Sequence, residues 1–105
     1  MQKKTLEKNP NYFEAVLQLR NPNDEMFRFI DNQLKGRKDV FVAKEEELKT
    51  GVDIYLSSWR FAIALGRKLK RSYKGEIKIS RRLHTRNKIT SKDVYRVTVL
   101  FRSFE

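Results

Sequence analysis

The sequence predicts a two-layer α+β domain in which a mainly antiparallel sheet carries two helices on one face, in the order β-α-β-β-α-β-β. Apolar residues alternate at period two in several short stretches, which is typical of half-buried strands. Two longer stretches repeat apolar residues at helical spacing. The chain has 105 residues, of which 39% are hydrophobic, and this suits one domain with a single core.

The N-terminal end is predicted to be a tail followed by a strand. Residues 1–10 are polar and end at a proline, so we expect a linker or tail there, and residues 11–105 then form the domain. Residues 12–20 alternate as the first strand. The predicted inner face of that strand is Phe13, Ala15, Leu17 and Leu19.

The first helix is predicted between Asn21, which can cap its start, and Gly36, a natural C-terminal stop. Pro22 suits the first helical position. Apolar residues recur at helical spacing at Phe27, Ile30 and Leu34. Val40–Ala43 and Gly51–Leu56 are predicted to be the second and third strands.

The second helix is predicted from Trp59 to Tyr73, after a cap at Ser57 or Ser58 and before a stop at Gly75. Its predicted apolar face is Ala62, Leu65, Leu69 and Tyr73. Gly66 lowers helix propensity, and we expect it to allow close packing on the sheet. A basic stripe on another face consists of Arg60, Arg67, Arg71 and Lys74.

The last two strands are predicted to form a hairpin. Glu76–Ser80 is the fourth strand, with Ile77 and Ile79 inward, and Val94–Arg102 is the fifth. Between them, residues 81–92 are predicted to be a long polar loop. The first six elements match a split βαβ, ferredoxin-like plan, to which the fifth strand is an addition. The outer sheet face is predicted to show Glu14, Val16, Gln18, Asp53, Tyr55, Lys78, Arg96 and Thr98.

Positive charge is concentrated in residues 67–92. This stretch holds eleven Lys and Arg and one acid, so it carries +10 of the chain's net +11. Residues 1–53 hold ten basic and ten acidic side chains and sum to zero. A positive field localised in this way indicates a polyanionic partner. The alternative is that these basic residues only form a solvated surface that keeps the protein soluble. The sequence therefore favours nucleic-acid binding.

Two sets of basic residues are predicted to contact RNA. The first lies in the predicted hairpin loop and consists of Arg81, Arg82, Arg86, Lys88 and Lys92. The second lies along the second helix and consists of Arg67, Arg71 and Lys74. Neither the RNP1 pattern of RRM sheets nor the GxxG loop of KH domains occurs. We therefore expect recognition of RNA backbone and shape.

Composition argues against metal and nucleophile chemistry. There is no cysteine and His84 is the sole histidine, so we expect no metal, cofactor or catalytic residue. The four glycines are far apart, which excludes a P-loop. We interpret Glu45–Glu47 as a solvated edge. A small acylphosphatase-like enzyme is the weakest alternative, because that class needs a glycine-rich phosphate loop where this chain has Asn21–Glu25.

Several segments resemble a known family, namely Gln18–Arg20, Gly51–Leu56, Ser80–Leu83 and Tyr95–Val99. They are similar to the adaptor for export of the large ribosomal subunit, historically called nonsense-mediated mRNA decay protein three, and particularly to its archaeal relatives. The resemblance covers roughly residues 11–102. It rests on moderately specific positions distributed along the chain and on no single diagnostic motif.

The resemblance implies a non-enzymatic factor that binds the large ribosomal subunit late in assembly and contacts ribosomal RNA, with ribosomal proteins as further partners. The family's cysteine-rich zinc region and leucine-rich export signal are missing, so we expect an internal domain of a longer protein. Thr50 stands where the family usually has an acid. We expect a cytoplasmic monomer with no membrane or small-molecule partner. The main alternative is a protein-interaction module whose basic patch binds an acidic protein.

Overall fold

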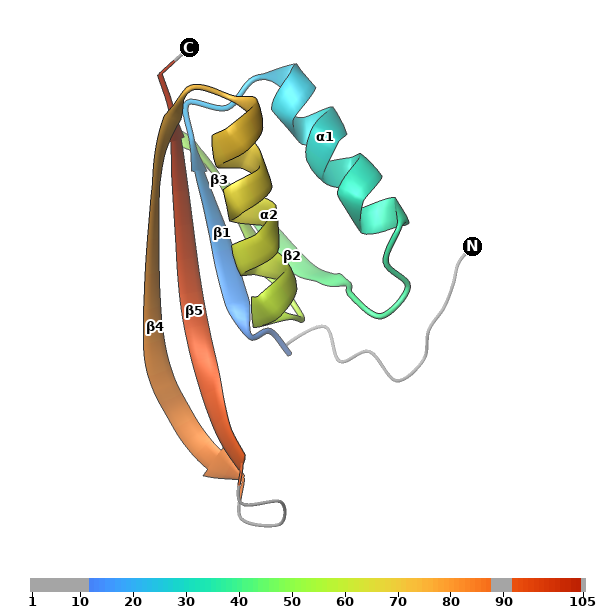
Figure 1. The fold of residues 1–105 in the computed structure, drawn as a ribbon, viewed down its shortest axis with the longest axis vertical. Helices are drawn as coiled ribbons and strands as arrows, with labels where there is room; N and C mark the ends of the chain where they lie inside the picture. The colour runs from blue at the N-terminus through green and yellow to red at the C-terminus, as the bar shows by residue number, and fades with distance from the viewer. Residues whose placement is uncertain (1–11, 88–91, 105) are drawn as a thin grey trace.

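The five strands form one sheet in the order β2-β3-β1-β5-β4, and both helices lie on one face of it (Figure 1). The structure is a computed structural model that describes residues 12–87 and 92–104. The elements are β1 Ala15–Arg20, α1 Asp24–Lys35, β2 Val42–Leu48, β3 Gly51–Leu56, α2 Trp59–Ser72, β4 Gly75–Asn87 and β5 Lys92–Ser103. The predicted α+β class and element order are confirmed.

The fifth strand lies inside the sheet. β5 pairs parallel with β1 and antiparallel with β4, while β3 pairs antiparallel with both β1 and β2. A plain split βαβ sheet would place the fourth strand beside the first, but here β5 separates them. Its central position explains why Val97, Val99 and Phe101 are at most 1% exposed.

The core fills the space between the sheet and the two helices. The residues that β1 and α2 bury in it include Ala15, Leu17, Leu19, Phe61, Ala62, Ile63, Leu65 and Leu69. Of the apolar face predicted for α2, Ala62, Leu65 and Leu69 are buried as expected, whereas Tyr73 follows the helix and is only partly buried. In α1 the buried residues are Met26 and Ile30, whereas Phe27 and Leu34 are only partly buried. The inner side of α1 is thus rotated towards Met26 relative to the prediction.

Two helix boundaries differ from the prediction. The side chain of Asn23, not Asn21, caps α1 by accepting a hydrogen bond from Met26 N at 2.9 Å. Asn21 has φ 57 in the turn after β1, a left-handed conformation that asparagine tolerates better than most residues. Ser58 caps α2, which was one of the two predicted choices. Gly75 does not end α2 but begins β4.

The second strand starts later and runs longer than predicted. β2 begins at Val42 and continues through Glu45–Glu47, with a register shift between Val42 and Lys44. The three glutamates are exposed on this edge strand, as expected for a solvated edge.

Most of residues 81–92 form paired strands, so the predicted loop is wrong. β4 and β5 continue as an arm beyond the N-terminal end of α2 (Figure 1). The arm has no helix to pack against, so apolar alternation stops although backbone pairing continues. A register shift between Leu83 and Thr85 also interrupts the alternation. Ile79, predicted to be inward, is 36% exposed on this edge strand. No helix in the described part of the chain is long and apolar enough to span a membrane.

Gly66 sets how closely α2 approaches the sheet. A Cβ atom there would lie 2.5 Å from Val99 Cγ1 and 3.1 Å from Ile77 Cδ1. We expect Gly66→Ala to lower the free energy of unfolding by about 1–3 kcal/mol, because overpacking outweighs the roughly 0.5–1 kcal/mol helix gain of alanine. Urea unfolding followed by circular dichroism measures the change.

Gly36→Ala is the matched control, because a Cβ atom there would have Gln33 O at 3.7 Å as its nearest neighbour. Its stability should stay within about 0.5 kcal/mol of the wild type. Equal stability of the two variants would contradict the close packing of α2 on β5.

Candidate nucleic-acid interface

The solvent side of α2 carries a row of basic side chains. Gly66 faces the sheet, and Lys68 donates a hydrogen bond to Gln33 Oε1 of α1 at 2.8 Å, so the remaining side points to solvent. The exposed residues of this side are Arg60, Ala64, Arg67, Lys70 and Arg71. The row along its middle, Arg60, Ala64, Arg67 and Arg71, is called here the basic face of α2. Neither Arg67 nor Arg71 forms an ion pair with another described residue.

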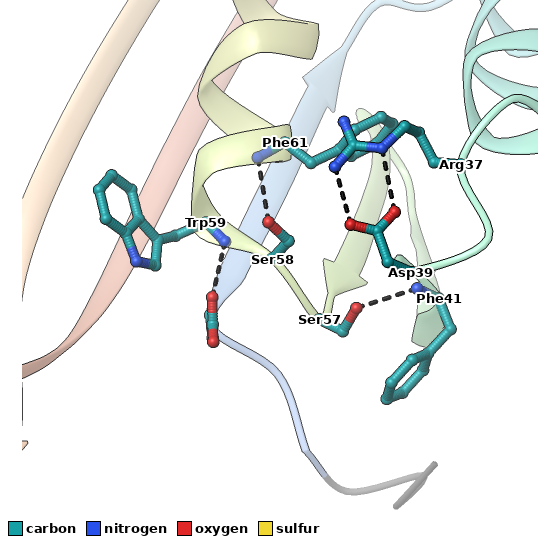
Figure 2. Close-up of polar contacts among 8 residues, drawn as sticks. Arg37, Asp39, Phe41, Ser57, Ser58, Trp59 and Phe61 are labelled. Atoms are coloured by element: carbon teal, nitrogen blue, oxygen red, sulfur yellow. Dashed lines mark hydrogen bonds and ion pairs between the residues drawn. The ribbon is translucent and has the colours of Figure 1, made fainter. Parts of the chain in front are cut away.

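The start of α2 is held by two acceptors (Figure 2). Ser58 Oγ accepts a hydrogen bond from Phe61 N at 3.2 Å. A carboxylate oxygen of Glu14 accepts one from Trp59 N at 2.9 Å. Both donors are N–H groups for which a helix has no internal acceptor, and the carboxylate also complements the positive helix end. Trp59 is therefore fixed at the first position of the helix.

The connection between α1 and β2 is tied to the same region (Figure 2). Arg37 donates two hydrogen bonds to the Asp39 carboxylate, both at 3.0 Å, and these bonds lower the pKa of Asp39. The Arg37 guanidinium lies 5.3 Å from the centre of the Phe61 ring. Phe41 N donates to Ser57 Oγ at 2.9 Å. These contacts link the loop before β2 to the residues that start α2.

Two arginines from different elements meet at Trp59. The guanidinium carbons of Arg60 and Arg81 lie 5.2 and 5.0 Å from the centre of the Trp59 ring. Arg81 also lies 5.8 Å from the centre of the Tyr95 ring, which itself packs edge-on against Trp59 at 6.4 Å. Such cation–π contacts restrict a guanidinium while leaving its N–H groups able to bind phosphate. Arg81 thus extends the basic face of α2 onto β4.

The two neighbouring arginines of β4 belong to different surfaces. Successive side chains of a strand point to opposite faces. Arg81 lies on the helix side, against Trp59, whereas Arg82 is directly opposite Arg96 on the other side of the sheet, called here the open face. The two residues therefore cannot contribute to one flat contact surface. The prediction had grouped them in one loop, and that grouping is wrong.

The other predicted RNA-contacting residues are placed as follows. Lys74 is exposed just after α2. Arg86 pairs with Asp93, and Lys92 pairs with Asn87, in the backbone register of the arm. The side chains of Arg86 and Lys92, and Lys88 as a whole, lie outside the described residues.

The chain bends at Glu14, and this changes the predicted faces of the first strand. β1 begins only at Ala15, so Phe13 does not join its inner face. The Phe13 ring instead packs edge-on against Tyr55 of the open face, with ring centres 4.9 Å apart. The Arg96 guanidinium lies 4.0 Å from the centre of the Phe13 ring. Glu14, predicted on the outer face, turns to the start of α2.

A hollow of about 330 Å³, called here the Phe13 hollow, lies on the open face. Its lining includes Phe13, Val16, Arg82, Arg96 and Thr98. Sequence reasoning placed Arg96 on this face but missed Phe13 as its neighbour. The alternation of residues 94–102 could locate Arg96, but only the bend at Glu14 brings Phe13 to it.

The carboxylates near the open face already have partners. Asp53 accepts a hydrogen bond from Arg20 at 2.9 Å and is 9% exposed. Glu46 accepts one from the Tyr55 hydroxyl at 2.7 Å, and this bond raises the pKa of Tyr55. Glu14 binds the start of α2. Arg82 and Arg96 form no ion pair with any residue that the structure describes.

A second hollow, of about 580 Å³, lies between the start of α1 and the turn from β2 to β3. Its lining includes Glu47, Lys49 and Thr50 but no Ser, Cys or His, so it offers no serine or cysteine nucleophile beside a histidine base. Within residues 12–87 and 92–104, no group of three His, Cys, Asp or Glu residues is placed to hold a metal ion.

Comparison with known proteins identifies a family. The family model described as NMD3, second domain, matches residues 12–102. A search of curated proteins finds no match. The matched range includes α2, the β4–β5 arm and the Phe13 hollow, so both basic surfaces lie within the family's domain.

We expect Glu14→Ala to lower the free energy of unfolding by about 1 kcal/mol, because the Trp59 N–H loses its acceptor. Trp59 is the only tryptophan, so its emission reports on this change and should shift to longer wavelength. Glu45→Ala removes the same charge from exposed β2 and is the control. Identical emission and unfolding curves for the two variants would refute the capping role.

Proposed function

Because the chain belongs to the NMD3 family, through its second domain, we propose that it is a non-enzymatic domain that binds the large ribosomal subunit through the backbone of ribosomal RNA. The family's setting is ribosome biogenesis and export by an adaptor. Large-subunit binding, ribosomal RNA contact and a cytoplasmic location are parts of the proposal.

The basic face of α2 is the observation on which the proposal rests. Arg60, Arg67 and Arg71 are exposed on one side of one helix. The helical rise places the first and last of them about 16 Å apart, enough to meet several phosphates. Arg81 adds a further guanidinium, oriented by Trp59, beside the start of this row. A rigid row of cations without acidic partners among the described residues suits a polyanion better than a mixed protein surface.

Contact with backbone and shape fits this geometry better than base reading. The arginines project from a helix packed on a sheet, so their spacing is fixed. They can therefore contact phosphates in the same way whatever the base sequence of the RNA. Double-stranded RNA is recognised mainly through its shape, phosphates and 2′-hydroxyls, which such a row can reach. The Trp59 and Tyr95 rings pack against each other and under Arg81, so they support the arginines.

The arm formed by β4 and β5 is the second part of the proposal. It extends beyond α2 and so could enter a groove that the rest of the domain cannot reach (Figure 1). Arg86, Lys88 and Lys92 would contribute phosphate contacts there, and Lys74 would contribute at the other end of α2. Arg82 belongs to the open face and would contact a different part of the RNA.

We expect binding to purified large ribosomal subunits to weaken steeply as salt concentration rises. Arg67→Ala combined with Arg71→Ala should weaken binding and reduce the log–log salt slope by about 1.4–1.8, since two phosphate contacts are lost. Small subunits serve as the specificity control. Lys35→Ala combined with Lys38→Ala removes the same charge from exposed positions that are not part of α2 and should leave the slope nearly unchanged.

Three results would count against the proposal. Equal, weak binding to both subunits would indicate a general polycation effect. An unchanged log–log salt slope in the variant with both Arg67→Ala and Arg71→Ala would show that α2 is not part of the interface. Binding that survives nuclease treatment of the subunit, with the same affinity, would identify an acidic protein as the partner.

A further inference from the structure

We propose that the Phe13 hollow on the open face binds one unpaired nucleotide of RNA, with Arg96 and Phe13 stacking the base and Arg82 holding a phosphate. This inference rests on the proposed function in taking RNA as the ligand. The inference goes beyond the proposed function because it places a second, chemically different contact on the side of the sheet away from the basic face of α2.

The first argument is the pairing of two like charges. Arg82 and Arg96 are direct cross-strand partners in the register of β4 and β5 and point to the same face. Like charges in this position destabilise a sheet unless an anion lies between them. Two carboxylates of the same sheet face, Asp53 and Glu46, are bound to Arg20 and Tyr55. A phosphate bound to the Arg82 guanidinium would accept charge-assisted hydrogen bonds from it and would offset this repulsion.

The second argument is the flat stack beside this pair. Arg96 lies 4.0 Å from the centre of the Phe13 ring, and Tyr55 supports that ring edge-on at 4.9 Å. The Arg96 guanidinium is therefore held on an aromatic support, and it is only partly exposed. Unpaired bases stack on aromatic rings and on guanidinium planes.

The third argument is the shape and size of the site. The hollow of about 330 Å³ is at the lower end of the range of small-ligand sites. Val16 adds apolar surface to its lining, and Thr98 adds a hydroxyl-bearing side chain. An acidic peptide would match the two charges but would leave the flat stack without a partner. A nucleotide combines an anionic phosphate with a flat base, so its chemistry matches both parts of the site.

The two surfaces are independent in the fold. The helices cover the opposite side of the sheet, so a double-stranded segment on α2 and a nucleotide in the Phe13 hollow would be separate parts of one RNA (Figure 1). The open face would then read a bulged or looped nucleotide, while α2 would contact the backbone.

The test measures binding of the full 105-residue chain to a labelled single-stranded RNA of about eight nucleotides by fluorescence anisotropy. Arg96→Ala should weaken binding by about 5- to 150-fold, the range expected for loss of a stacked base. Phe13→Leu keeps apolar volume but removes the ring, and it should weaken binding less than Arg96→Ala. Arg82→Ala should lower the salt slope by about 0.7, as expected for one single-strand phosphate contact.

Two controls separate this site from general charge. Lys78→Ala removes one positive charge from the same face of β4, four residues from Arg82 and outside the hollow, and should change binding by less than about twofold. An abasic strand of equal length keeps the phosphates and lacks the bases. It should bind more weakly than the normal strand, and Arg96→Ala should affect it no more than Lys78→Ala does.

The outcomes distinguish the two proposals. Equal losses for Arg96→Ala and Lys78→Ala, or equal binding of the abasic and normal strands, would overturn the nucleotide site. Binding of polyglutamate with the same dependence on Arg82 and Arg96 would also overturn it. A chain that binds large subunits but not the single strand loses this inference and keeps the proposed function. If the chain binds the single strand through Arg96 but does not bind large subunits, the nucleotide site is supported and the proposed function is overturned.

Discussion

The contact of α2 with β5 at Gly66 is the constraint on which the rest of the domain depends. With no side chain at Gly66, the helix lies against Val99 and Ile77, and its rotation about its own axis is set. Because successive residues turn by about 100°, burying Leu65 and Leu69 forces Arg67 and Arg71 to the solvent side. Core packing and the display of positive charge are therefore two results of one fixed rotation.

The start of α2 couples the helix side of the sheet to the open face. Glu14 turns inward to accept the Trp59 N–H, and the chain bends there before β1 begins. The bend leaves Phe13 on the opposite side of the sheet, against Tyr55 and Arg96. One capping carboxylate thereby fixes Trp59, which orients Arg60 and Arg81, and also permits the stack at the Phe13 hollow.

The charge on β4 has two physical consequences. β4 is an edge strand of thirteen residues, and an exposed edge of this length could pair with other chains. Lys78, Arg81 and Arg82 oppose such pairing by repulsion, and the register shift after Leu83 further disturbs the edge. The same charges remain without ion-pair partners among the described residues, so they stay free to meet an anion.

The sequence alone determined the features that depend on neighbours along the chain. Alternation located β1, β3 and β5, helical spacing located α2 and its buried face, and composition located the charge in residues 67–92. It could not determine which strands pair, because strand order depends on contacts between distant segments. The insertion of β5, the arm beyond α2, and the separation of Arg81 from Arg82 were decided only in the tertiary structure. The arm was not predicted for a related reason. Periodicity reveals a strand through its buried face, and Arg81, Arg82 and Leu83, where β4 enters the arm, are all exposed.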